Sequence, residues 1–434
     1  MITIILSIFV LGYMAIALEH NIKIDKSAPS LIVGVLCWTV YILMADKQAH
    51  TIVHELYEYL GEISGILFFL LGAMTIVELI DAHQGFEDIT QFITTQKRIK
   101  LLWMVCMLTF FLSAALDNLT TTIVMVSILR KLLKDRQTRM FFVCMVVIAA
   151  NAGGAWSPIG DVTTTMLWIG GQITAESIIT KLILPSLACI FAPLMVITFA
   201  YRKKLYSYPN ERGNTDNLNN DFDHQEPVSV AERRIVLFAG LACLIFVPFF
   251  KSVTHLPPFM GILLGLGALW LLTEIMHKSK NTEQKHPLSV MGVLKRVDVP
   301  SVLFFFGILV AISSLQATGI LKEMALLLDH HIGNIYTIAL SLGLLSAVVD
   351  NVPLVAATMG MYELTLFPTD HIMWELIAYC SGTGGSALII GSAAGVAAMG
   401  MEKIPFGWYL REVSWLALIG YFTGAVIFIT LFAY

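Results

Sequence analysis

The sequence predicts an all-α polytopic membrane protein made of two inverted-topology repeats, each with a re-entrant helical hairpin and a discontinuous transmembrane helix. Of the 434 residues, 57% are hydrophobic and only 13% are charged, about half of the roughly 25% found in soluble domains. Apolar runs close to the ~20 residues needed to cross a bilayer recur along the whole chain. Finally, the motif Ser-Ala-x-x-Asp-Asn occurs at 113–118 and again at 346–351. An acid repeated in two apolar halves is the main indication of function.

These apolar runs divide the chain into two halves. We expect scaffold helices in residues 1–60, a first repeat in 61–200, a cytoplasmic linker in 201–232, further scaffold helices in 233–298 and a second repeat in 299–434. The clearest apolar runs are 2–17, 29–45, 61–80, 178–200, 235–250, 261–275, 299–315 and 413–432. Residues 50–60 are expected to lie on the outer surface, ahead of a helix over 61–80.

Lysine and arginine predict the orientation, because cytoplasmic loops carry an excess of both. Placing the basic clusters in the cytoplasm leaves only Lys47, Lys181, Lys251 and Lys322 outside. This arrangement puts both termini outside. We expect a multi-pass protein of a bacterial inner (cytoplasmic) membrane.

The first repeat contains a hairpin and a broken helix. Segment 99–134 has basic residues at both ends, so it is either two complete helices or a hairpin that enters from the cytoplasm. Its second arm is short for a ~30 Å core at ~1.5 Å per residue, which favours a hairpin with residues 117–122 at its tip. Segment 140–171 is interrupted at 151–161 by glycines, a proline and polar residues. Backbone of that kind is tolerated at membrane depth where it lines a protein cavity.

The second repeat follows the same plan in the opposite orientation. Its hairpin, 334–366, is expected to enter from outside, and segment 371–401 is broken at a matching place. The glycines in these breaks either allow close helix packing or mark unwound backbone, and their polar surroundings favour unwound backbone. They are Gly153, Gly154, Gly160, Gly384, Gly385 and Gly391. Inverted repeats with discontinuous helices predict a substrate site near the bilayer midplane.

Asp117, Asp161 and Asp350 are the predicted exchangeable charges. A carboxylate at membrane depth is costly unless it is paired, hydrated or protonated. One interpretation is that each aspartate caps the short helix that follows it. The other is a site that holds a cation and a proton in turn, because burial favours the neutral acid and a bound cation favours the ionised form. The two interpretations are compatible.

Oxygen-bearing side chains near these aspartates are the predicted neutral ligands of a hard monovalent cation. Taken singly, a Ser or Thr in a helix more often bonds its own backbone, and the clustering beside the acids is what singles these residues out. The set is Asn118, Thr121, Thr122, Asn151, Ser157, Thr163, Thr164, Asn351, Ser386 and Ser392. Sodium is expected at Asp117, Asn118, Asn151 and Asp161, because the first half carries more of these groups.

Other functional classes find little support in the composition. The net charge of −4 gives no reason to expect a nucleic-acid partner, and six dispersed cysteines within apolar runs indicate packing residues. We see no nucleotide-binding loop, no nucleophile–base pair and no HExxH motif, so we expect neither an enzyme nor a cofactor. Transport coupled to an ion gradient is the prediction, with a passive channel as an alternative.

At these motifs the chain resembles the NhaD-type sodium/proton antiporters, a branch of the ion-transporter superfamily that also holds arsenite, citrate and dicarboxylate carriers. The matching segments are GEISGILFFLLGAM (61–74), ALDNLTTT (115–122), NAGGAWSPIGDVTT (151–164), VDNVPLV (349–355) and GTGGSALIIGSAAG (382–395). Dicarboxylate carriers of the superfamily typically have Ser-Asn-Thr at the hairpin tips, where this chain has Asp-Asn. A fixed negative charge at each tip suits a bare cation and repels a polyanion.

The resemblance implies a homodimeric secondary transporter that works by an elevator-like or rocking motion. We expect exchange of cytoplasmic Na⁺, and also Li⁺, for external H⁺, in the service of pH and salt homeostasis. Na⁺, H⁺ and membrane lipids are the expected partners. The alternative within the superfamily is an anion carrier for arsenite or a carboxylate.

Overall fold

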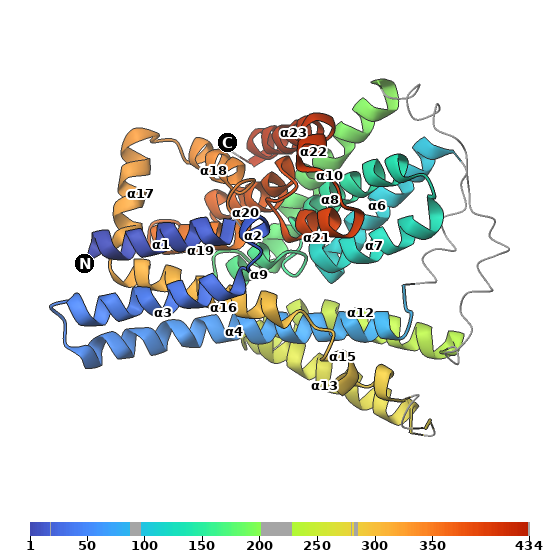
Figure 1. The fold of residues 1–434 in the computed structure, drawn as a ribbon, viewed down its shortest axis with the longest axis horizontal. Coiled ribbons are helices and arrows are strands. Elements are labelled where there is room, and N and C mark those ends of the chain that lie inside the picture. The colour runs from blue at the N-terminus through green and yellow to red at the C-terminus, as the bar shows by residue number, and fades with distance from the viewer. Residues whose placement is uncertain (18, 87–96, 201–227, 279, 282–284, 433–434) are drawn as a thin grey trace.

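A computed structural model describes residues 1–434 except 18, 87–96, 201–227, 279, 282–284 and 433–434 (Figure 1). The regular secondary structure of the described residues is helical throughout. Eight helices in this part of the chain are long and apolar enough to cross a membrane. The predicted all-α, multi-pass architecture is therefore confirmed. Most of the predicted linker, 201–227, lies outside the described residues.

The first half contains two hairpin arms and a helix interrupted before its last turns. Its helices are α1 (Ile2–Ala17), α2 (Glu19–Ile22), α3 (Ser27–Met44), α4 (Ala49–Ala82), α6 (Arg98–Leu116), α7 (Asn118–Leu132), α8 (Arg136–Gly154), α9 (Val162–Ile169) and α10 (Ala175–Ala200).

The second half repeats this order with extra short helices. It comprises α12 (Val230–Thr254), α13 (Pro258–Met276), η2 (His286–Leu288), α15 (Val290–Val293), α16 (Val299–Ala317), α17 (Ile320–His331), α18 (Ile335–Leu345), α19 (Asn351–Met361), α20 (Ile372–Gly384), η3 (Gly385–Ala387), α21 (Ala393–Glu402), α22 (Phe406–Glu412) and α23 (Ser414–Phe432).

The packing of the helices shows the two-fold relation between the halves. The scaffold consists of α1, α3, α4, α12, α13 and α16, so it includes α4 and α16, which lie mostly or wholly in the segments assigned above to the repeats. In it, α1 packs on α3 as α12 packs on α13, while α3 packs on α16 and α13 packs on α4. Helix α3 of the first half therefore packs against a helix of the second half, and α13 of the second half packs against a helix of the first. Around the centre, α6 packs on α8 as α18 packs on α20, and α21 contacts α7 as α9 contacts α19. The hairpins α6–α7 and α18–α19 lie on opposite sides of the centre (Figure 1).

Two features of the scaffold differ from the sequence prediction. Residues 50–60 do not form a separate surface stretch; they are the first turns of α4, a continuous helix of 34 residues. At ~1.5 Å per residue this helix is much longer than the ~30 Å apolar core needs. Tyr41 and Lys47 both hydrogen-bond Glu55, and these bonds hold the added turns. The amphipathic helix α17 was also not expected from the sequence.

In each discontinuous helix, the interruption begins further along the chain than the first glycines of the motif that predicts it. Gly153 and Gly154 form the last turn of α8, and Gly384 ends α20. Their backbone is helical, so the prediction that these three glycines are unwound is wrong. A Cβ on Gly153 would strike the carbonyl oxygen of Phe110 in α6, and one on Gly384 would strike that of Gly343 in α18. Close packing of the broken helix on its hairpin is therefore the reason for glycine at both places.

Candidate ion-binding site

The three aspartates singled out in the sequence line one internal cavity of about 70 Å³. Asp117 lies at the tip of the first hairpin, Asp161 in the break after α8, and Asp350 at the tip of the second hairpin. Residues from both repeats and from the scaffold helices α4 and α16 complete the walls. The fold thus brings together the charges that are spread over 234 positions of the sequence.

Four short helices begin around this cavity, and each has a side-chain cap. Asp117 accepts a hydrogen bond from the backbone N–H of Thr120 (2.8 Å), and Asp161 accepts one from that of Thr163 (2.9 Å). Asp350 and Ser392 do the same for α19 and α21, at 3.2 and 3.1 Å. The capping interpretation of the aspartates is therefore correct, and it is compatible with exposure of the carboxylates to the cavity. Helix N-termini favour negative charge, so the carboxylates lie where four helix dipoles point at the cavity.

Asp117 also has an unusual backbone conformation. It is the single residue between α6 and α7, with φ 81° and ψ 160°. That region is adopted almost only by glycine and costs a residue with a side chain about 1–3 kcal/mol. The carboxylate has a second bond, from the hydroxyl of Thr120 (2.8 Å). A strained acidic residue at a position that glycine would fill more easily indicates that the carboxylate itself is required.

A chain of side-chain hydrogen bonds links the two repeats behind the cavity. Asn118 donates to Asp161 (2.6 Å) and to the amide oxygen of Asn151 (3.1 Å). Asn151 in turn donates to the hydroxyls of Ser386 and Ser392, both at 2.9 Å. These residues are at most 3% exposed. All five were singled out in the sequence, and the structure brings them into one network.

The second hairpin tip is held by the scaffold. The ammonium group of Lys26 lies 3.3 Å from Oδ2 of Asp350, and the backbone N–H of Asp350 donates to the hydroxyl of Tyr13 (2.9 Å). Lys26 lines the cavity together with the three aspartates. With all four side chains ionised, this group carries a net charge of −2.

The other predicted ligands have different positions. Asn351 lines the cavity, whereas Ser157 donates to the backbone of Ala114 (2.6 Å) and so holds the break against the first hairpin. Thr163 and Thr164 both bond Asp161, through its side chain and its carbonyl oxygen respectively.

Thr121 and Thr122 lie in the first two turns of α7, just after the hairpin tip. Both are completely buried, and within the described structure their hydroxyls have no hydrogen-bond partner. Neither lines the cavity. They are therefore buried polar groups beside the site whose hydrogen-bonding capacity is unused in this conformation.

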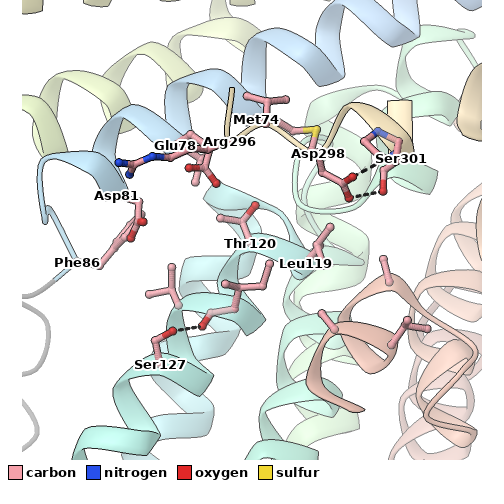
Figure 2. A pocket seen from close by; sticks show the side chains of 18 of the residues that line it. Met74, Glu78, Asp81, Phe86, Leu119, Thr120, Ser127, Arg296, Asp298 and Ser301 are labelled. Carbon is pink, nitrogen blue, oxygen red and sulfur yellow. Dashed lines mark hydrogen bonds between the residues drawn. The ribbon is translucent and has the colours of Figure 1, made fainter. Parts of the chain in front are cut away.

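A larger vestibule of about 630 Å³ adjoins the cavity and shares Lys26, Met74, Leu119, Thr120, Ser301 and Ala393 with it. Figure 2 shows Glu78 and Asp81 of α4 facing Arg296, with Asp298 and Ser301 nearby at the start of α16. The vestibule reaches Gln84 and Lys131, at the predicted cytoplasmic end. Its walls carry five carboxylates and three basic groups: Glu19, Asp25, Glu78, Asp81, Asp298, Lys26, Lys131 and Arg296. Such an acidic approach raises the local concentration of cations.

Comparison with known proteins supports a transporter of cations. Residues 13–377 match the family model described as "Citrate transporter" (CitMHS). The chain is 47% identical to Sodium/proton antiporter 2 of Arabidopsis thaliana, covering 97% of this chain and 98% of that protein. It is 49% identical to Sodium/proton antiporter 1 of the same plant, over 96% of this chain and 70% of that protein. It is also 30% identical to the Na(+)/H(+) antiporter NhaD of Vibrio cholerae serotype O1, over 98% and 91% of the two chains.

The chain belongs to the NhaD-type sodium/proton antiporter family. The resemblance read from the motifs is thereby confirmed, as is the expectation that the protein is a transporter and not an enzyme. The fold is that of the YdaH transporter of Alcanivorax borkumensis, with a TM-score of 0.61 at 10% identity, covering 95% of this chain and 99% of that one. The relatives come from plants and from bacteria, so placement in a bacterial inner membrane stays a prediction.

Two residues of the site, Lys26 and Tyr13, are not predicted by the sequence. In the sequence, Lys26 is one of the basic residues expected to set the orientation, and nothing in its neighbourhood separates it from Lys23. Thr120 belongs to the predicted hairpin tip, and its place three residues after Asp117 lets its N–H and its hydroxyl both donate to the carboxylate of that N-cap residue.

Proposed function

We propose that the protein exchanges cytoplasmic Na⁺ for external H⁺ at the cavity between the hairpin tips, and that Asp117, Asp161 and Asp350 are the exchangeable charges. The observation that carries this proposal is the convergence of three aspartates on one cavity of about 70 Å³. This volume suits a small ion with a few coordinating oxygens. Li⁺, which has the same charge and a smaller radius, is expected to be accepted as well.

Competition for the same carboxylates couples the two ions. A cation near Asp117 and Asp161 favours their ionised forms, whereas burial in the absence of a cation favours protonation. Sodium binding therefore releases protons, and protonation releases sodium. If the cavity opens to one side at a time, this competition alone gives antiport. The vestibule extends toward Lys131 and Gln84, which supports loading from the predicted cytoplasmic side.

An anion carrier is the second candidate, because four helix N-termini meet at the cavity and helix N-termini bind anions. In this chain, however, three of them are capped by aspartates. The carboxylates occupy the positions where an anionic substrate would be held. This arrangement supports a cation as the substrate.

Proton flux in vesicles tests the proposal. In everted vesicles or proteoliposomes with an imposed proton gradient, Na⁺ and then Li⁺ are expected to dissipate the gradient. Asp117→Asn and Asp161→Asn are expected to abolish the response, whereas Asp46→Asn, at an exposed position after α3, retains it. Dissipation by citrate and none by Na⁺ would instead support the anion carrier.

The remaining expectations accompany this proposal as predictions. They are a homodimer, contact with membrane lipids, and both termini on the outer side. The distribution of Lys and Arg supports the orientation. Single-sided labelling of a cysteine introduced near residue 2 would measure it.

A further inference from the structure

Lys26 occupies an unexpected place for a basic residue of a cation transporter. It immediately precedes α3, and its ammonium group lies 3.3 Å from Oδ2 of Asp350 and 4.3 Å from the ring centroid of Phe304. The two charged side chains are 22% and 19% exposed. An ion pair with a carboxylate and a cation–π contact with an aromatic ring therefore hold the ammonium group at the wall of the ion cavity.

The ion pair connects two parts of the molecule. Lys26 is the N-cap of α3 and Phe304 lies in α16, which packs on α3, while the hydroxyl of Tyr13 on α1 accepts a hydrogen bond from the backbone N–H of Asp350. Asp350 itself is at the tip of the α18–α19 hairpin. By contrast, the carboxylate of Asp117 at the first tip is bonded by Thr120, a residue of its own hairpin. Only the second tip therefore has a scaffold lysine on its carboxylate among the described residues.

An ammonium group and a sodium ion carry the same charge, so they compete for one carboxylate. We propose that Lys26 is a tethered cation that occupies Asp350 while the cavity is empty, and that the transported cation displaces it. This inference rests on the proposed antiport function. It gives Lys26 the role of a positioning residue, which acts through Asp350.

The same pair restrains the empty transporter. Any motion of the second hairpin relative to the scaffold separates Lys26 from Asp350 and leaves two charges unpaired in a largely apolar region, which is costly. A bound cation lowers this cost, because it neutralises Asp350 and frees the hairpin, while the displaced Lys26 still lines the vestibule, whose walls carry Glu19, Asp25 and Asp298. The ion pair thereby keeps the unloaded protein from changing between conformations that open the cavity to opposite sides of the membrane. Because an empty cavity does not change sides, proton leak is suppressed.

Sodium kinetics in proteoliposomes test the inference. Lys26→Met is expected to lower the KM for Na⁺ about five- to tenfold, the range for losing a partly buried competitor, and to raise proton leak without Na⁺. Lys26→Arg retains the wild-type KM and leak. Lys23→Met, at an exposed lysine three residues earlier, is the matched control and changes neither.

A double-mutant cycle with Asp350→Asn shows whether Lys26 acts through Asp350, and it is measured as the Kd for Na⁺ from sodium-dependent thermal stabilisation of the purified protein, because Asp350 is itself a proposed exchangeable charge. In the Asp350→Asn background, Lys26→Met is expected to change this Kd by less than twofold, whereas in the wild-type background it lowers the Kd. An equal effect in both backgrounds, or a KM or Kd that rises in Lys26→Met alone, overturns the inference. A wild-type protein that shows no sodium response at all contradicts the proposed antiport function instead, so the two failures are distinguishable.

Discussion

At the scale of single residues, Asp117 combines a carboxylate that the proposed exchange requires with a backbone conformation that disfavours any side chain. Its φ of 81° belongs to the left-handed half of the map, where a side chain is strained. The residue nevertheless stands where two helices join without any further linker residue. The proposed transport function and the stability of the fold therefore favour different residues at this position.

Replacing Asp117 by glycine and by alanine separates the two demands. Both variants lose the carboxylate and the cap of α7, but only glycine relieves the backbone strain. We expect Asp117→Gly to be more stable than Asp117→Ala by about 1 kcal/mol, while neither supports sodium-dependent proton flux. Thermal unfolding in detergent measures the difference. Equal stability of the two variants would show that the backbone here is not strained.

Most residues of the site are predictable from the sequence, because the same polar residue types occur at matching places in the two halves. The Asp-Asn pairs at 117–118 and 350–351 stand out against apolar surroundings, and the polar breaks mark Asn151 and Asp161. Lys26 was not predictable in the same way. Its charge is typical of a cytoplasmic loop, and its proximity to Asp350 depends on the packing of α3 against α16, which no local pattern encodes.

At the scale of elements, close contact between each broken helix and its hairpin positions the site. Gly153 of α8 packs against Phe110 of α6, and Gly384 of α20 packs against Gly343 of α18. The contacting atoms are backbone carbonyl oxygens, which cannot move aside as a flexible side chain does. Ser113 and Ser346 reinforce the same two interfaces by donating to the backbone of Ala150 and Ser381.

Alanine substitutions test this packing. Gly153→Ala and Gly384→Ala are each expected to destabilise the protein by about 1–3 kcal/mol, the usual range for overpacking, and to impair transport. Gly267→Ala is the matched control, because a Cβ at that helical position in α13 meets nothing within 4 Å. Thermal unfolding and proton flux are the measurements. If Gly153→Ala were as stable as Gly267→Ala, the proposed close contact would be wrong.

The sequence predicted most elements but misjudged what the glycines do. Hydropathy identifies helices of suitable length, and the repeated polar interruptions identify the breaks. The prediction of unwound backbone at Gly153, Gly154 and Gly384 failed because glycine has two uses, conformational freedom and small size. Which one applies depends on the neighbouring helix. The sequence does not predict that α4 continues through residues 50–60, because this stretch is much more polar than residues 61–80.

At the scale of the whole molecule, a pair of buried histidines joins the two halves at one end of the scaffold. His83 ends α4 and His277 ends α13, and their Nε2 atoms are 2.8 Å apart. Nδ1 of His83 donates to the carbonyl oxygen of Leu79 (2.7 Å), so its Nε2 accepts from His277. Burial lowers the pKa of His83 from 6.5 to about 4, and burial lowers that of His277 as well.

This pair predicts a loss of stability in mild acid. Because the pKa of His83 is lower in the folded than in the unfolded protein, its contribution is fully present above pH 6.5 and decreases as the pH falls toward 4. The loss reaches about 2 kcal/mol near pH 5. We expect the melting temperature of His83→Gln to fall less over this range than that of the wild type. His50→Gln, at an exposed histidine, follows the wild type. Parallel pH profiles for all three proteins would refute the prediction.

In the scaffold, helices of the first half pack against helices of the second half, and this has a consequence for biosynthesis. Helix α3 packs on α16, and α4 packs on α13, so the first half leaves the ribosome before the helices that cover its scaffold exist. Lys26 must likewise wait for Asp350, 324 residues later. The amino-terminal half therefore has to persist in the membrane as an unfinished intermediate. A chain that stops within the second half is expected to be recognised as defective and degraded, however well its individual helices insert.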